Sequence, residues 1–140
     1  MTGHGVRLTD DGRGAVLTLA WATPPITANG QRGSHHAHAR HVREVRALAA
    51  GLARAARTPD RRQLRLQRAD IALVWYPTIA RRRDAPNLYP LLKPLVDGLV
   101  TAGLLPDDND DVVTVAAPRI VLQSAGPARF ELTITERTTP

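Results

Sequence analysis

Four stretches of the sequence carry the apolar pattern of β-strands. Residues 15–21 and 69–76 are continuous runs of apolar and aromatic residues, and the second run reads ADIALVWY. Such an unbroken run is typical of a strand buried on both faces, so we expect residues 69–76 at the centre of a sheet. Further strands are expected over residues 112–123, with a bend at Pro118, and over residues 129–135, where apolar and polar residues alternate. We expect these last two strands to pair as antiparallel neighbours.

Two other stretches repeat their apolar residues every three or four positions, which is the spacing of an amphipathic helix. Residues 37–57 have one apolar face, and arginines occupy much of the remaining surface. Residues 88–103 form a second, leucine-rich helix, for which Gly103 is a suitable C-terminal stop. Pro90 and Pro94 are expected near its first turn, where a missing N–H group is tolerated.

The order of these elements is strand, helix, strand, helix, strand, strand. This order predicts an α+β (mixed α/β) fold, with a sheet of about four strands covered by two helices. The chain of 140 residues has the size of one domain, so we expect a single domain over residues 1–140. Residues 1–13 and 136–140 show neither pattern and are expected to be loose tails.

Charge adds a functional expectation, because the formal net charge of the chain is +6. A basic surface favours a polyanionic partner, most commonly nucleic acid. Two tryptophans, two tyrosines and one phenylalanine are too few for a base-stacking platform. The absence of cysteine excludes disulfides and thiolate metal sites. No apolar run is long enough to span a membrane, and the N-terminus lacks a signal-peptide core, so we expect a cytoplasmic protein without a membrane partner.

Acidic residues are concentrated in residues 81–113, which hold six of the 13 Asp and Glu residues. Asp84 follows three arginines, and Asp107 and Asp108 open an acidic loop after the second helix. By themselves these patterns are typical of a local ion pair and a solvated turn. If the two loops met, their carboxylates would suit Mg²⁺ or Mn²⁺, and Lys93, the only lysine, could hold a phosphate beside them.

Whether the two loops meet depends on the helix between them. A helix of this length separates its ends by roughly 15–22 Å. Asp84 and Asp108 would therefore meet only if the sheet brought both loops to one edge, or if two subunits paired. Lys93 also has an alternative partner in Asp97, four residues further along the helix.

A second group of potential ligands consists of four histidines. These are His35, His36, His38 and His41. Only His38 and His41 have a helical spacing, so we interpret the group as a polar loop rather than as a metal site.

The ordered motifs in residues 83–113 resemble the RusA family of Holliday-junction resolvases, which occurs in phages and prophages. The core of that family is a D-x-D-N element, a helix carrying a lysine, an A-G pair and a D-D pair before a strand. Here the corresponding sequence is RRRDAPNLYPLLKPLVDGLVTAGLLPDD. The segment TPPITANGQR resembles the family's P-P-x-x-x-N segment at Pro24, Pro25 and Asn29, and ELTIT resembles its last strand.

This resemblance implies a small homodimeric endonuclease that depends on Mg²⁺ or Mn²⁺ and cuts four-way (branched) DNA junctions in recombination and repair. It implies that Asp84 and Asp108 are catalytic metal ligands, that Asp107 is a further ligand, and that Lys93 is the catalytic lysine. We expect DNA contacts from Asn29, Arg81, Arg82, Arg83 and Asn87.

One position departs from the family pattern. Pro86 occupies the place of the second acidic residue of D-x-D-N, and proline cannot bind a metal ion. Asp107, Asp110 or Asp111 could supply the missing carboxylate. Three hypotheses follow: a junction endonuclease, a relative that binds branched DNA without cutting it, and a small basic interaction protein unrelated to DNA.

Overall fold

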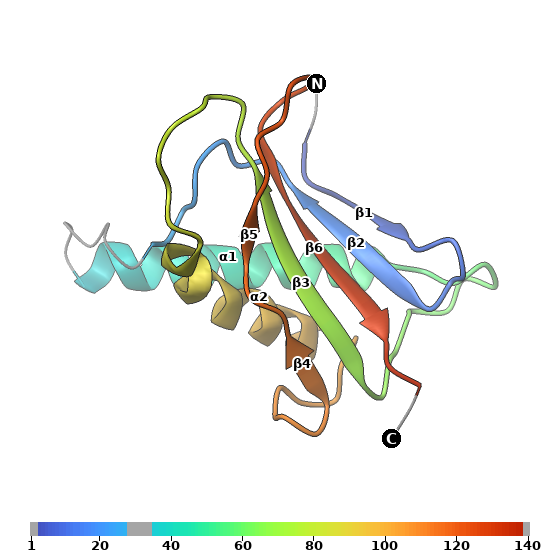
Figure 1. Ribbon diagram of the computed structural model, residues 1–140. Helices are drawn as coiled ribbons and strands as arrows, with labels where there is room; N and C mark the ends of the chain where they lie inside the picture. The colour runs from blue at the N-terminus through green and yellow to red at the C-terminus, as the bar shows by residue number, and fades with distance from the viewer. Residues whose placement is uncertain (1–2, 28–34, 139–140) are drawn as a thin grey trace.

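The computed structural model describes residues 3–27 and 35–138 (Figure 1). The elements, in chain order, are β1 (Gly5–Leu8), β2 (Gly14–Leu19), α1 (His35–Ala55), β3 (Ala69–Tyr76), the 3₁₀ helix η1 (Ala85–Leu88), α2 (Tyr89–Thr101), β4 (Val113–Val115), β5 (Arg119–Ile120) and β6 (Arg129–Glu136). The strands form one mixed sheet, and α1 and α2 lie on the same side of it (Figure 1). The α+β fold expected from the sequence is confirmed. None of the helices described is long and apolar enough to cross a membrane.

The sheet is organised around β3 and β6. The strand order is β1-β2-β6-β3-β4, and β5 also pairs with β3. β6 is antiparallel to both β2 and β3, whereas β4 and β5 run parallel to β3. The expected antiparallel pairing between β6 and the strand before it is therefore wrong. Pro118 divides that segment into two short strands, whereas β3 offers β6 a partner of its own length, eight residues.

The N-terminal segment is more ordered than the sequence predicts. Residues 5–8 form β1 and pair antiparallel with β2, so residues 1–13 are not a loose tail throughout. The hairpin closes through the Thr9 N–H, which donates to the Gly14 carbonyl at 2.9 Å. The partly buried side chains of Val6 and Leu8 pack against the core, which favours this pairing. With β1 and the divided segment, the sheet has six strands rather than about four.

The C-terminal segment also continues beyond its expected end. β6 ends at Glu136, and the Arg137 N–H donates to the Arg68 carbonyl at 3.0 Å. Glu136 and Arg137 are thus held beside the start of β3. The expected tail residues 139–140 lie outside the described part of the chain.

Helix α2 differs from its expected form at its proline residues. Pro90 lies in the first turn as expected, but Pro94 lies inside the helix, where it removes a hydrogen bond to the Pro90 carbonyl. Pro94 is buried, as are Leu91 and Leu95 around it, so tertiary packing offsets this loss. Gly103 has a φ of 83° directly after the C-cap and acts as the expected stop.

The two long helices approach each other closely at Gly98. A Cβ atom at this position would lie 2.5 Å from the Arg46 carbonyl oxygen and 2.7 Å from the Ala49 Cβ. Further along, the Arg46 guanidinium donates to the Thr101 hydroxyl at 3.2 Å. This contact fixes α2 against α1 and leaves the opposite side of α2 facing β4.

An aromatic cluster fixes the C-terminal end of β3. The Trp75 ring stacks on Phe130 with a centroid distance of 5.3 Å and an interplanar angle of 4°. Trp21 and Phe130 form a T-shaped pair with a centroid distance of 5.7 Å. The Trp75 indole N–H also donates to the Ala22 carbonyl at 3.2 Å, which ties the segment after β2 to the end of β3.

Candidate functional site

The end of β3 opens into a hollow of about 270 Å³, which we call the arginine hollow. Residues from the segment that follows β2 and from the loop that joins β3 to η1 line it. Figure 1 shows the course of these two segments near the end of β3. Its lining residues are Thr23, Pro24, Thr27, Trp75, Arg81, Arg82, Arg83, Asp84, Asn87 and Leu88. Every described residue that we expected to bind DNA therefore lines one hollow, while Asn29 lies outside the described residues.

The turn of η1 places Asp84 and Asn87 at this hollow. Asp84 is the N-cap of η1, and its carbonyl accepts a hydrogen bond from the Asn87 N–H at 3.0 Å. The Asp84 side chain makes no capping hydrogen bond and is exposed. Pro86 is exposed on the same turn, in keeping with the preference of proline for the start of a helix.

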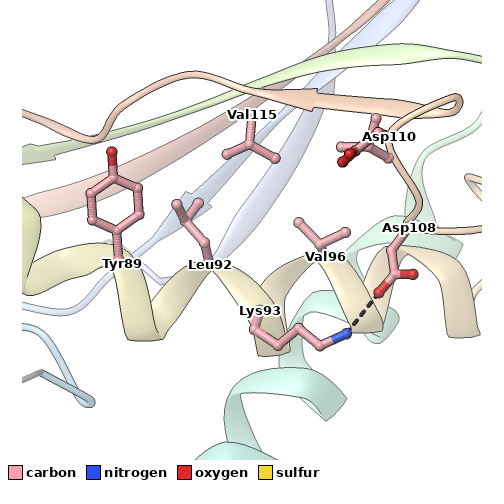
Figure 2. Close-up of a pocket in the computed structure, with 8 residues that line it drawn as sticks. Tyr89, Leu92, Lys93, Val96, Asp108, Asp110 and Val115 are labelled. Atoms are coloured by element: carbon pink, nitrogen blue, oxygen red, sulfur yellow. Dashed lines mark hydrogen bonds and ion pairs between the residues drawn. The ribbon is translucent and has the colours of Figure 1, made fainter.

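A second hollow, of about 410 Å³, lies between α2 and the edge strand β4, and we call it the lysine hollow (Figure 2). Its lining residues are Tyr89, Leu92, Lys93, Val96, Asp108, Asp110, Val113 and Val115. Figure 2 shows Tyr89 at one end and Asp108 and Asp110 at the other. The floor is apolar, and the charged groups stand at the rim.

Lys93 connects Asp97 of α2 with Asp108 of the acidic loop at this rim. Its Nζ donates to the Asp108 carboxylate at 2.7 Å and to the Asp97 carboxylate at 3.0 Å. The loop after α2 therefore folds back along the helix. The contact with Asp108 raises the pKa of Lys93 and lowers the pKa of Asp108, with Asp97 adding to the rise for Lys93. The two residues predicted to be the catalytic lysine and a catalytic aspartate are thus in direct contact.

The rest of the acidic loop is a hydrogen-bonded turn. The Asp107 carboxylate accepts from the Asp108 N–H at 2.7 Å and from the Asn109 side-chain amide at 3.1 Å. The Asn109 side-chain oxygen accepts from the Asp111 N–H at 3.0 Å. Asp107 therefore shapes the turn, as the interpretation of this loop as a solvated turn predicts.

The carboxylates predicted to bind Mg²⁺ do not form one site. Asp84 lines the arginine hollow, whereas Asp108 lines the lysine hollow, and the two hollows share no lining residue. Within residues 3–27 and 35–138, no three His, Asp or Glu side chains are arranged to hold a metal ion. The residues of one described chain thus do not fit the expected metal centre, because the turn before α2 and the loop after it place their carboxylates apart.

The histidines do not form a polar loop as a group. His35 is the first residue of α1, and His36, His38 and His41 follow within the helix. Alanines alternate with them at positions 37 and 39, and alanine is the strongest helix former.

Trp75 and Thr23 are among the residues at the hollows that were not predicted as site residues. Trp75 lies beneath Arg83 with the guanidinium carbon 4.9 Å from its ring centroid, and Thr23 lines the same hollow. The alternating burial of β3 turns Trp75 toward the core, but its contact with a loop arginine depends on how the loop folds. That contact has no signal in the local sequence.

Comparison with known proteins adds no relative. No protein-family model and no curated protein sequence matches this chain. The similarity to RusA resolvases therefore remains a prediction, supported by the residues quoted for it.

The contact between Lys93 and Asp108 predicts a specific titration behaviour. In Asp108→Asn, the pKa of Lys93 should fall toward its ordinary value of 10.5, because the first cause of its rise is removed. The carbon-13 signal of the Lys93 side chain reports this directly, because the protein has only one lysine. Asp110→Asn is the matched control, and it should shift the Lys93 titration less. An unchanged Lys93 titration in Asp108→Asn would contradict the contact.

The same pair sets a pH window for its contribution to stability. The contribution of Asp108 is fully present above its ordinary pKa of 3.8 and is lost as the pH falls through its lowered pKa. The contribution of Lys93 is fully present below 10.5 and is lost as the pH rises through its raised pKa. The pair should therefore contribute fully to stability between about pH 3.8 and pH 10.5.

Proposed function

We propose that this chain is a RusA-like protein that binds branched DNA, with the arginine hollow as its DNA-binding site. The observation that carries this proposal is the convergence of two stretches that resemble the family. Pro24, from the P-P segment, and Asp84 and Asn87, from the D-x-D-N segment, are far apart in sequence but line the same hollow. If the resemblance arose by chance, there would be no reason for these two sequence segments to lie together in the fold.

The charge of this hollow also supports DNA as the ligand. Arg81 and Arg82 are exposed, and no ion pair within the described residues involves any of the three arginines that line the hollow. Three positive charges against the single carboxylate of Asp84 leave a net charge of +2 at the hollow (3 − 1 = 2). Arginines placed this way neutralise backbone phosphates and release counterions.

Metal-dependent cleavage is the second candidate, and the contact between Lys93 and Asp108 favours it. The resemblance assigns these two residues to the catalytic group, and they are 2.7 Å apart. Asp84 lies at the other hollow, and Pro86 stands where the family has an acidic residue. An active site would therefore need further carboxylates, for example from a second subunit of the implied homodimer. For this reason binding without cleavage is the first proposal.

The test is a comparison of a four-way junction with a linear duplex of the same sequence. Gel-shift titrations should show tighter binding to the junction, and denaturing gels should show no nicks with Mg²⁺ or Mn²⁺. Equal affinity for both DNAs would overturn the junction preference. Metal-dependent nicks would establish the second candidate, and Asp108→Asn should then abolish them.

The salt dependence of this binding gives a quantitative prediction. The slope of log K against log salt changes by about 0.9 for each phosphate contact. Changing Arg81, Arg82 and Arg83 together to alanine should therefore reduce its magnitude by about 2–3. The matched control changes Arg54, Arg57 and Arg68 to alanine, which removes the same charge away from the hollow and should reduce the slope by less. If the salt slope fell by the same amount in both triple variants, the arginine hollow would not be the DNA-binding site.

A further inference from the structure

We infer that Arg83 is the fixed phosphate-binding residue of the arginine hollow, that Trp75 positions it, and that Arg81 and Arg82 supply charge around it. The inference rests on the proposed function for the branched DNA that carries the phosphate. The phosphate chemistry itself follows from the geometry of the hollow, and it applies equally to an unbranched duplex.

The first support is the position of the Arg83 guanidinium. Its central carbon lies 4.9 Å from the centroid of the Trp75 ring, within the range of a cation–π contact. The indole cannot move away easily, because it stacks on Phe130 and donates to the Ala22 carbonyl. Trp75 is thus a rigid platform that belongs to the core, and Arg83 rests on it. Arg83 is half-buried, whereas Arg81 and Arg82 are exposed.

The second support is the way in which the Arg83 side chain is anchored. One Nη1–H group donates to the Arg81 carbonyl at 3.2 Å, which holds the guanidinium beside the loop. A guanidinium has five N–H donors. Within the described residues, the Arg81 carbonyl is the one acceptor that Arg83 contacts. The remaining donors are therefore available to a ligand in the hollow.

The third support is the chemistry of the hollow. A planar guanidinium fork matches two oxygens of a phosphate, so it selects phosphate by shape as well as by charge. Arg81, Arg82 and the Thr23 hydroxyl line the same hollow. Asp84 is the one negatively charged residue among the lining residues. Its carboxylate repels a phosphate, so a bound phosphate should lie on the arginine side of the hollow.

The burial of Trp75 excludes the main alternative ligand. A nucleobase would need an open aromatic ring on which to stack, as in single-strand-binding proteins. Trp75 is only 6% exposed and already carries Arg83. The hollow therefore favours the DNA backbone rather than a base.

A positioned arginine and a mobile one respond differently to replacement by lysine. Lysine keeps the charge but has neither the fork nor the planar face that rests on an indole. Arg83→Lys should therefore lower DNA affinity by at least about tenfold, because a charge-assisted bidentate contact is lost. The matched control, Arg82→Lys, should change affinity by less than about twofold, because a mobile surface charge is merely replaced by another.

The experiment measures binding of both variants to the four-way junction and to the linear duplex, over a range of salt concentrations. For Arg83→Lys, affinity should fall for both DNAs, while the salt slope and the thermal midpoint of unfolding stay at wild-type values. Trp75→Phe keeps an aromatic ring next to Phe130 but offers a weaker cation–π platform, so it should reduce affinity in the same direction by a smaller factor.

The possible outcomes separate this inference from the proposed function. If Arg83→Lys and Arg82→Lys bind alike, the inference is overturned, whatever the junction preference. If wild-type protein shows no junction preference but Arg83→Lys still weakens duplex binding, the inference stands and the junction function fails. If wild-type protein binds neither DNA, both proposals fail.

Discussion

Phe130→Ala is expected to lower the free energy of unfolding by about 3–5 kcal/mol. Phe130 is completely buried, stacks on Trp75 and forms a T-shaped pair with Trp21. Its removal would leave a cavity where β6 meets β3 and the segment after β2. Urea unfolding followed by circular dichroism measures the change. Since a domain of this kind is stable by only about 5–15 kcal/mol, the variant would lose a large share of its stability.

Thr133→Ala is the matched control on the same strand. Thr133 is half-buried, and the alternation of β6 turns it away from the core face that carries Phe130. Its replacement should change the free energy of unfolding by less than about 1 kcal/mol. A similar loss in both variants would mean that the aromatic cluster is not the centre of stability at this end of the sheet.

The fold class could be predicted because it depends on local patterns. The run ADIALVWY is apolar apart from Asp70 and forms the central strand β3. The repeated apolar spacing predicted α1 and α2 within a few residues of their ends. Gly103 ends α2 through its positive φ, which glycine adopts without strain. Each of these signals lies inside the element that it predicts.

The strand pairing could not be predicted in the same way. β6 could have paired with the strand before it, and the sequence contains no local sign that it lies between β2 and β3 instead. The pairing of β6 depends on which other strands match its length and leave an edge free to pair, and this is a property of the assembled sheet. The pairing of β1 with β2 is different, because it depends on a tight hairpin at Gly12, where φ is 71°. Asp11-Gly12 is a local turn signal, but residues 5–8 are too short a run to show a strand pattern.

In the candidate site, too, the sequence predicts residues that are neighbours along the chain but not the contacts between residues that are distant in sequence. The sequence predicted Asn87 and the arginines near Asp84, and these residues are neighbours along the chain. It also named Lys93 and Asp108, but the contact between them depends on the loop after α2 folding back along the helix. The separation of Asp84 from Asp108 follows from the length of α2 and from where its flanking loops lie.

Gly98→Ala should destabilise the protein, although alanine is the better helix former. On helix propensity alone, replacing glycine by alanine stabilises a helix by about 1 kcal/mol. At Gly98 the new Cβ would lie 2.5 Å from the Arg46 carbonyl oxygen and 2.9 Å from the Ala50 amide nitrogen. Backbone atoms cannot swing aside as a flexible side chain can, so α1 and α2 would have to move apart. We expect a net loss of about 1–3 kcal/mol in urea unfolding.

Gly51→Ala provides the matched control, because it is the same substitution in α1 with open space around it. Gly51 is exposed, and a Cβ there meets no atom within 4 Å. Here propensity alone should act and raise the free energy of unfolding by about 0.5–1 kcal/mol. The opposite signs of the two changes isolate the contact between the helices from the intrinsic effect of alanine. Stabilisation in both variants would mean that α1 and α2 are not in close contact at Gly98. The packing of α2 against α1 would then not explain how the helix that carries Lys93 is held in place.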